Sequence, residues 1–309
     1  MMVTPVELFC GVALDFVAGD PRWLPHPVTA IGSVASAAEK VWRTVNLPVR
    51  LAGSLAWISV VAAVCIPVYA SVALVPAPWI QVYWIFSFLA VRSLDTHAAA
   101  VIACLRAGDL PAARRSVARI VGRDTTDLEE PEVTRAGFET VSESLNDGVI
   151  APLFWLAIGG PVGMAAYKAA NTLDSMFGHK NERYLEFGWA SARADDIANL
   201  IPARMTAVLI WVVALLLPGL SARNSVRSTW RDAGKQPSPN SGYPEAAVAG
   251  ALGVQLGGVN FYRGVRSQKA FLGDALKPLR WTLYAPLRAI VYSTAGLFAA
   301  LLGGIAAWV

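Results

Sequence analysis

Long apolar segments alternate with polar blocks along this chain, and the alternation predicts membrane-spanning helices. Two segments, Leu51–Val75 and Ala289–Val309, are long enough to cross a bilayer, which takes about 20 apolar residues. A third segment, Ala77–Val91, follows the first after a proline-flanked break, so we expect the pair to form a helical hairpin. The pattern therefore predicts an all-α, polytopic integral membrane protein.

Three further apolar segments are shorter or interrupted. Val3–Ala18 carries two acidic residues, which favours a partly buried helix. Val149–Ala166 contains a Gly-Gly-Pro break, and Met205–Leu220 falls short of a full span. We therefore expect re-entrant or surface-lying helices at these two places. No linker or repeat divides the chain, so residues 1–309 are expected to form a single integral membrane domain with cytoplasmic helical loops.

Composition and charge support a membrane location. Only 16% of the residues are charged, against about 25% in soluble domains, and 55% are hydrophobic. The net charge of +4 and basic residues beside the apolar segments are typical of a bacterial inner-membrane protein. These residues are Arg43, Arg50, Arg92, Lys277, Arg280 and Arg288. They are not gathered on one polar module, which argues against nucleic-acid binding.

The polar block Asn171–Arg204 packs nine charged residues into a short segment of an otherwise apolar chain. Ionisable side chains set among membrane-depth segments are costly, which favours a functional role. A solvated loop between two spans is the alternative, but it explains less well the Asn and aromatic residues mixed among the charges. The candidate residues of this block are Asp174, Lys180, Glu182, Arg183, Arg193, Asp195, Asp196 and Arg204.

Glu143, Asn146 and Asp147 are spaced so that one helix face presents all three side chains. Magnesium usually takes one or two carboxylates together with substrate phosphates, so this face is a candidate metal site. An acidic helix end capped by Gly148 is the alternative.

Asp195, Asp196 and Asn199 repeat this spacing. Arg193 and Arg204 bracket them and can hold phosphate oxygens through two parallel hydrogen bonds. A magnesium–phosphate site is the functional interpretation, and charges that pair within a loop are the alternative.

Two isolated residues also invite a functional reading. Arg123 follows Gly122, and either it contacts phosphate or the glycine only ends a helix. His26 lies in a stiff, proline-rich turn, where it is either a proton carrier or, as is more common for a lone histidine, structural. No GxxxxGK[ST], GxGxxG or GxSxG motif occurs, so nucleotide chemistry would need a less familiar site.

Five longer blocks match a known family in the same order. They are GDPRWLPHPVTAIG (Gly19–Gly32), VGRDTTDL (Val121–Leu128), ESLNDGVIAPLFW (Glu143–Trp155), NTLDSMFGHKNERYLEFGWASARADDIANLIPAR (Asn171–Arg204) and DAGKQPSPNSGYPEAAVAGALGVQLGG (Asp232–Gly258). Through them the chain resembles the adenosylcobinamide-phosphate synthase family of cobalamin biosynthesis over nearly its whole length. A membrane family linked to control of β-lactamase expression is a weaker relative.

The resemblance implies an ATP-dependent amide ligase of the cell membrane. That family joins the amino group of aminopropanol, or of its O-phosphate, to a propionate carboxylate of adenosylcobyric acid. The implied partners are the corrinoid, the amine, ATP, magnesium and membrane lipid, without nucleic acid. A homo-oligomer, or an association with other cobalamin-assembly membrane enzymes, stays open. Because ATP and the corrinoid are cytoplasmic, Asn171–Arg204 is expected to face the cytoplasm.

The residue types suggest a division of roles for such a reaction. The expected catalytic residues are Asp174, Glu182, Asp195 and Asp196. The expected substrate- and phosphate-binding residues are Arg123, Lys180, Arg183, Arg193, Arg204, Lys235 and Asn240. The expected magnesium ligands are Glu143, Asn146, Asp147, Asp195, Asp196 and Asn199.

A transporter and a non-catalytic membrane sensor are the competing interpretations. Broken helices with intramembrane charge fit a transporter too, but transporters usually carry internal repeats, and the sequence shows none. A sensor akin to the β-lactamase-control family would turn over no ATP when corrinoid is present.

Overall fold

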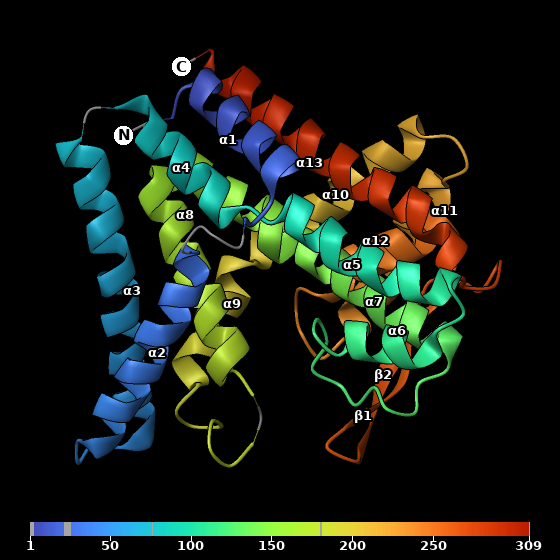
Figure 1. Cartoon of the computed structure of the whole chain (residues 1–309), viewed down its shortest axis with the longest axis horizontal. Coiled ribbons are helices and arrows are strands. Elements are labelled where there is room, and N and C mark those ends of the chain that lie inside the picture. The colour runs from blue at the N-terminus through green and yellow to red at the C-terminus, as the bar shows by residue number, and fades with distance from the viewer. Residues whose placement is uncertain (1–2, 22–25, 76, 180, 309) are drawn as a thin grey trace. The chain divides into compact units, whose positions relative to one another are not determined.

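The computed structural model describes residues 3–21, 26–75, 77–179 and 181–308. These residues are mostly helical, which confirms the predicted fold class, and they also include one two-stranded sheet that the sequence pattern did not predict. The chain divides into two compact units (Figure 1). Unit 1 comprises Met1–Ala90, Asp147–Asn199 and Ala299–Val309, and unit 2 comprises Val91–Asn146 and Leu200–Phe298.

Unit 1 is built from helices only, within the part of the chain that the structure describes. Its helices are α1 (Pro5–Ala18), α2 (Pro27–Thr44), α3 (Val49–Leu74), α4 (Pro78–Phe88), α8 (Ala151–Phe177), α9 (Trp189–Ala198) and the last part of α13 (Tyr284–Ala306). α3 packs against α2, α8 and α9, and α1 packs against α4 (Figure 1). The core between them is made of small and branched apolar side chains such as Ala56, Val60 and Leu173.

The helix starts of unit 1 follow from local sequence. Thr4 and Glu7 form a capping box at the start of α1, in which each side chain accepts a hydrogen bond from the other residue's backbone N–H. His26 caps α2, because its Nδ1 accepts a hydrogen bond from the Val28 N–H at 3.3 Å while its Nε2 lies 3.0 Å from Asp20 Oδ1. The structure therefore favours the structural interpretation of His26.

The two irregular places in the central helices carry special backbone chemistry. Gly160 has φ 60° and ψ −157°, a conformation that only glycine adopts readily, and Pro161 follows it, so α8 is broken where the sequence predicts a break. Before α8, Asn146–Ile150 forms a π-helix. The chain thus continues through Gly148 instead of ending a helix there, and π-turns of this kind are frequent at functional sites.

Unit 2 combines helices with the hairpin. Its helices are α5 (Val91–Arg106), α6 (Leu110–Val117), α7 (Glu130–Leu145), α10 (Leu200–Leu216), α11 (Ala222–Asp232), α12 (Gly242–Leu252) and the first part of α13 (Tyr284–Ala306), with short 3-10 turns at Ala233–Lys235 and Trp281–Leu283. α11 and α12 approach so closely that a Cβ on Gly250 would lie 2.3 Å from the Asn224 carbonyl oxygen. Only glycine fits at that crossing.

The hairpin of unit 2 pairs β1 (Leu256–Tyr262) with β2 (Val265–Leu272) in antiparallel fashion. Gly258 is opposite Lys269 and Asn260 is opposite Ser267. The turn places Arg263 and Gly264 at positive φ, and Asp124 stabilises it by accepting hydrogen bonds from both backbone N–H groups at 3.0 and 2.7 Å.

Several helices are long and apolar enough to cross a membrane. Four candidates qualify among the described residues: Val49–Leu74, Pro78–Arg106, Glu130–Phe177 and Trp281–Ala306. They confirm an integral membrane protein, and they contain the predicted spans at Leu51–Val75 and Ala289–Val309 almost completely. A further pair, Trp189–Ala198 and Leu200–Leu216, is bent by 41° and forms either a broken span or a re-entrant loop.

Candidate functional site

Acidic side chains from three separate sequence blocks gather around two neighbouring residues of α8. The charges of Asp20, Asp147 and Asp195 all act on the Lys168 ammonium. Tyr167, next to it, interacts with Asp147 and Asp195 and also with Asp174. We call this group, together with Asn171 and Asn199, the Lys168 cluster; all of its members belong to unit 1.

Hydrogen bonds fix the centre of the Lys168 cluster. Asp195 accepts one bond from the Asn171 amide at 3.1 Å and another from the Asn199 amide at 3.0 Å, one on each carboxylate oxygen. The side-chain oxygen Oδ1 of Asn199 in turn accepts a bond from the Tyr167 hydroxyl at 2.9 Å. Tyr167 and Asn199 are buried. The chain of bonds therefore holds Asp195 in one orientation.

Helix geometry explains why these side chains meet. Tyr167, Asn171 and Asp174 are three or four residues apart along α8, so they share one face of that helix. Asp195 and Asn199 are four residues apart at the end of α9, which packs against α8. Asp195 and Asn199 thus lie on one helix face as predicted, and this arrangement lets Asn199 orient the Asp195 carboxylate.

The charge balance of the Lys168 cluster favours a positively charged ligand. Three carboxylates act on one ammonium, which leaves an excess of negative charge when all are ionised. Among the residues that the structure describes, no group of three or more His, Cys, Asp and Glu side chains is arranged to hold a metal alone. The donor set still fits magnesium, because that ion commonly uses only one or two carboxylates and takes its other oxygens from phosphate and water.

The other predicted residues of unit 1 lie on its surface. Glu182 is exposed, and Arg193 is 66% exposed and lies 3.8 Å from Asp196. Arg183 donates two hydrogen bonds to Glu39, at 3.1 and 3.0 Å, and this hydrogen bonding raises the pKa of Arg183. Lys180 lies outside the described residues.

The loop that carries Arg183 is anchored to α2 and α3. Glu39 also accepts a bond from Arg43 at 2.8 Å, and Arg50 pairs with Glu186 at 2.9 Å. Phe187 is buried beside α3, so it is a core residue and cannot stack on a substrate ring. A Cβ on Gly53 would meet the Phe187 carbonyl oxygen at 1.9 Å, which shows how closely this loop approaches α3.

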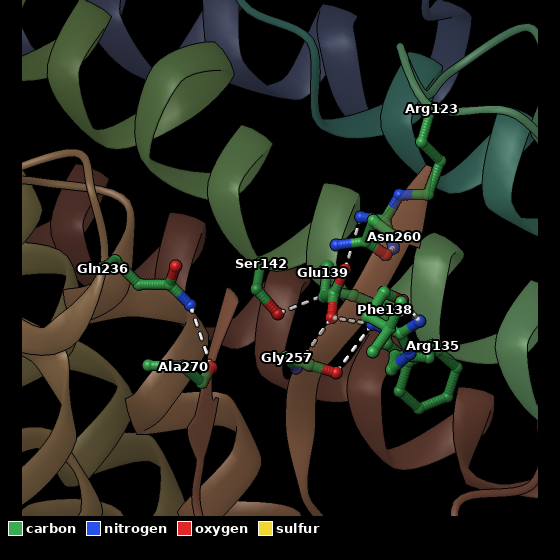
Figure 2. Close-up of polar contacts among 10 residues, drawn as sticks. Arg123, Arg135, Phe138, Glu139, Ser142, Gln236, Gly257, Asn260 and Ala270 are labelled. Carbon is green, nitrogen blue, oxygen red and sulfur yellow. Dashed lines mark hydrogen bonds and ion pairs between the residues drawn. The ribbon is translucent and has the colours of Figure 1, made fainter. Parts of the chain in front are cut away.

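Unit 2 contains a buried ion network centred on Glu139 (Figure 2). Arg123 pairs with Glu139 and donates to the Asn260 side chain at 2.7 Å. Arg135 donates to the carbonyl oxygens of Gly257 and Val259 at 2.6 and 2.8 Å. The Gly257 N–H donates to Glu139 at 2.8 Å. Arg123 is therefore paired inside the protein, where it joins its loop and the hairpin to α7.

Glu245 is a second buried carboxyl of unit 2. It is fully buried, and neither of its carboxyl oxygens has a hydrogen-bond partner among the described residues. Burial raises its pKa well above the ordinary value, and the negative charge of Glu143 raises it further. Of the predicted metal ligands in this unit, Glu143 is half-buried and Asn146 accepts a bond from Thr206 at 3.0 Å.

The remaining predicted cations of unit 2 each have a partner. Arg204 lies 4.2 Å from the centroid of the Tyr243 ring and donates to Asn240 at 3.4 Å. Lys235 pairs with Asp232 at 2.7 Å. Burial alone would raise the pKa of Asp232, but bonds from Arg231, Lys235 and the Gly273 N–H hold it at about 2.

The sequence analysis did not select several residues that the structure brings to these sites. They are Asp20, Tyr167, Lys168, Asn171, Arg135, Glu139, Glu245 and Asn260. Lys168 had a detectable signal, because it is a single charge close after an apolar run, and a charge inside a span usually has a function. The contact between Glu139 and Gly257 had none, since the two residues are 118 positions apart in the sequence.

Comparisons with known proteins support the family resemblance that the five sequence blocks suggested. The family model described as CobD/Cbib protein matches residues 8–289. Cobalamin biosynthesis protein CobD of Pelobacter propionicus is 46% identical over 296 residues, or 94% of this chain and 91% of the relative. The CobD protein of Geobacter metallireducens is 50% identical over 288 residues, or 91% of this chain and 90% of the relative.

A third relative carries the other family name. Cobalamin biosynthesis protein CbiB of Salmonella choleraesuis is 43% identical over 275 residues, which is 86% of each chain. No solved structure matches. These matches confirm the resemblance to the adenosylcobinamide-phosphate synthases: the chain belongs to the CobD/CbiB family of cobalamin biosynthesis proteins.

Proposed function

We propose that this protein joins the amino group of aminopropanol, or of its O-phosphate, to a propionate carboxylate of adenosylcobyric acid, with ATP as the energy source. The family match across residues 8–289 carries the proposal. The Lys168 cluster supports it, because it offers both an ammonium for anionic groups and carboxylates for cationic ones.

The reaction requires the carboxylate to become an acyl donor. Attack of a propionate oxygen on the γ-phosphate of ATP gives an acyl phosphate and ADP. Attack of the amine nitrogen on the acyl carbon then forms the C–N bond, and the breaking C–O bond releases inorganic phosphate. The amine arrives as an ammonium, so it must lose one proton before the attack and a second one after it.

The Lys168 cluster contains groups for both halves of this reaction. In our proposal Lys168 holds the substrate carboxylate and its acyl phosphate by charge. Asp195 binds the incoming ammonium and accepts its proton, since Asn171 and Asn199 already fix its orientation. General-base catalysis of this kind contributes about 10²–10⁴-fold to a rate. Asp174, which acts on the neighbouring Tyr167, adds negative charge on the same side of α8.

Magnesium would be held by Asp20 and Asp147 in this proposal. When bound, it would neutralise the charge that develops on the phosphate oxygens. The remaining phosphate contacts would come from cations on the surface of unit 1 such as Arg193, whose side chain is 66% exposed. In unit 2, Arg204 presents its guanidinium beside Tyr243, an arrangement that suits a ring-bearing or phosphate-bearing ligand.

We place the Lys168 cluster on the cytoplasmic side of the membrane, because both ATP and the corrinoid are cytoplasmic. Leu185 is a suitable position for a test of this placement, because it lies in the polar block Asn171–Arg204, as Asp195 does, and is 58% exposed. A single cysteine at Leu185, in a chain whose Cys10, Cys65 and Cys104 are replaced, should resist an impermeant thiol reagent in intact cells and react after lysis. Labelling in intact cells would contradict the cytoplasmic placement.

The activity itself can be tested directly. The purified protein in detergent is incubated with adenosylcobyric acid, magnesium ATP and either aminopropanol or its O-phosphate, and the products are analysed by mass. We expect the corrinoid amide and stoichiometric ADP, with neither product when the corrinoid is left out. The proposal fails if folded protein gives no amide with either amine.

A further inference from the structure

A cavity of about 590 Å³ lies between α5 and α13 in unit 2, and none of its lining residues belongs to the Lys168 cluster. Arg106 and Ile102 line it from α5. Trp281, Arg288 and Tyr292 line it from the start of the α13 region. The cavity thus joins two cations, aromatic rings and an apolar wall, and the proposed amide synthesis does not use it.

Arg106 supplies a cation that the described part of the protein does not neutralise. Its side chain is exposed, and its guanidinium lies 5.6 Å from the centroid of the Trp281 ring. No Asp or Glu of the described residues forms an ion pair with it. A cation at a cavity wall that no carboxylate of the described residues pairs with is well suited to an anionic ligand.

The opposite wall of the cavity is held in place by Asp95. This buried carboxylate pairs with Arg288 at 3.1 Å and accepts a hydrogen bond from the Tyr292 hydroxyl at 3.0 Å. It also accepts a bond from the Tyr284 hydroxyl, and Arg92 lies 3.4 Å away. Arg288 is therefore oriented before any ligand binds, while about half of its side chain stays exposed.

The position of the cavity along the spans indicates what fills it. Arg106 is the last residue of the candidate span Pro78–Arg106, and Trp281 is the first residue of the span Trp281–Ala306. Both line one cavity, so these two span ends lie on the same side of unit 2. Trp and Tyr concentrate at the level of the lipid headgroups, and basic pockets between spans at that level bind anionic headgroups.

We propose that this cavity binds the phosphate of an anionic phospholipid. Arg106 and Arg288 hold the phosphate oxygens, and Trp281, at the span end beside Arg106, lies at the level of the lipid headgroup. The acyl chains then run along the apolar wall that includes Ile102 and Ala289. A soluble phosphate would meet the same two cations but would leave this wall uncovered.

The test compares lipids on the whole protein by native mass spectrometry in detergent. Dioleoyl phosphatidylglycerol is the anionic probe and dioleoyl phosphatidylcholine is the neutral one. We expect Arg106→Gln to weaken phosphatidylglycerol binding by about fivefold or more, from the usual contribution of one basic residue near an anionic headgroup. Phosphatidylcholine binding should not change. Arg227→Gln is the matched control, because it removes an exposed arginine of unit 2 outside the cavity.

Two further arms identify the ligand and guard against misfolding. Arg106→Lys keeps the charge but loses the planar fork, so its affinity should fall between those of the wild type and Arg106→Gln. Inorganic phosphate should not displace phosphatidylglycerol. Displacement by phosphate would assign the cavity to a soluble phosphate and overturn the lipid assignment. Equal binding of the two lipids, or an unchanged affinity in Arg106→Gln, would overturn the site itself.

Discussion

The Asn171 side-chain amide donates a hydrogen bond to the Asp195 carboxylate at 3.1 Å and so ties α8 to α9. The two residues are 24 positions apart in the chain. Because Asn199 donates to the other oxygen of Asp195, this carboxylate cannot rotate without losing both bonds. Such preorganisation is what a base or a cation-binding carboxylate needs.

The first prediction concerns Asp195. Asp195→Asn removes the negative charge and turns an acceptor of two hydrogen bonds into a group that also donates, so it should lower the rate of amide formation by about 100-fold or more. The measurement is the rate of corrinoid amide production by mass. Asp127→Asn, at an exposed position outside the cluster, is the matched control and should keep its rate. Equal rates in both variants would remove Asp195 from the reaction.

The second prediction concerns Lys168. Lys168→Met leaves the carboxylates of Asp20, Asp147 and Asp195 without their ammonium, so their mutual repulsion should rise. We expect the variant to lose amide synthesis and to unfold at a lower temperature in detergent. Lys168→Arg keeps the positive charge, so it should restore the unfolding temperature more fully than the rate of amide synthesis. A fully active Lys168→Met would contradict the role that we give to this ammonium.

The third prediction concerns the buried ion network of unit 2. Glu139→Gln leaves the Arg123 guanidinium buried without its countercharge, which costs about 3–5 kcal/mol in the free energy of unfolding. Glu186→Gln breaks an exposed pair with Arg50 instead and should cost about 0–1 kcal/mol. Denaturant unfolding in detergent measures both. Similar losses in the two variants would show that the Glu139 network is no stronger than a surface pair.

The fourth prediction concerns acid stability. Folding lowers the pKa of Asp232 from 3.8 to about 2, so the folded protein binds fewer protons than the unfolded chain in this range. The stabilisation, about 2 kcal/mol, is fully present above the unfolded pKa and is lost as the pH falls towards the folded pKa. Asp232→Asn should be less stable than the wild type at pH 6, and the difference should shrink between about pH 4 and pH 2. A constant difference across this range would contradict the assignment.

The fifth prediction concerns Glu245, whose effect on the pH dependence of stability has the opposite sign to that of Asp232. Its pKa is raised in the folded protein, which therefore binds more protons than the unfolded chain as the pH rises above the ordinary pKa. The protein therefore loses stability through Glu245 as the pH rises above the ordinary pKa of a glutamate. Glu245→Gln has nearly the same shape without the charge and should raise the melting temperature at pH 8 by about 2 °C or more. The gain should disappear near pH 4, and a variant less stable at pH 8 would refute the account.

Much of the local structure could be predicted from the sequence. Apolar segments of bilayer length gave the spans at Leu51–Val75 and Ala289–Val309, and the Gly-Gly-Pro run gave the break in α8. Helical spacing placed Asp195 and Asn199 on one face. All of these rest on residues a few positions apart, whose geometry is set by the backbone itself.

The sequence by itself determined a membrane-embedded helical chain, the breaks in its helices and, through its ordered motif blocks, its family. Only the tertiary structure decided that Asp20, Asp147 and Asp195 share one lysine, and that Arg123 is paired with Glu139. It also decided that the chain between α12 and α13 forms a hairpin. Arg123 and Asn260 are 137 positions apart, and no short-range pattern relates residues at that separation. Their contact exists because burying a guanidinium requires partners for its charge and its N–H groups, and packing alone determines which residues provide them.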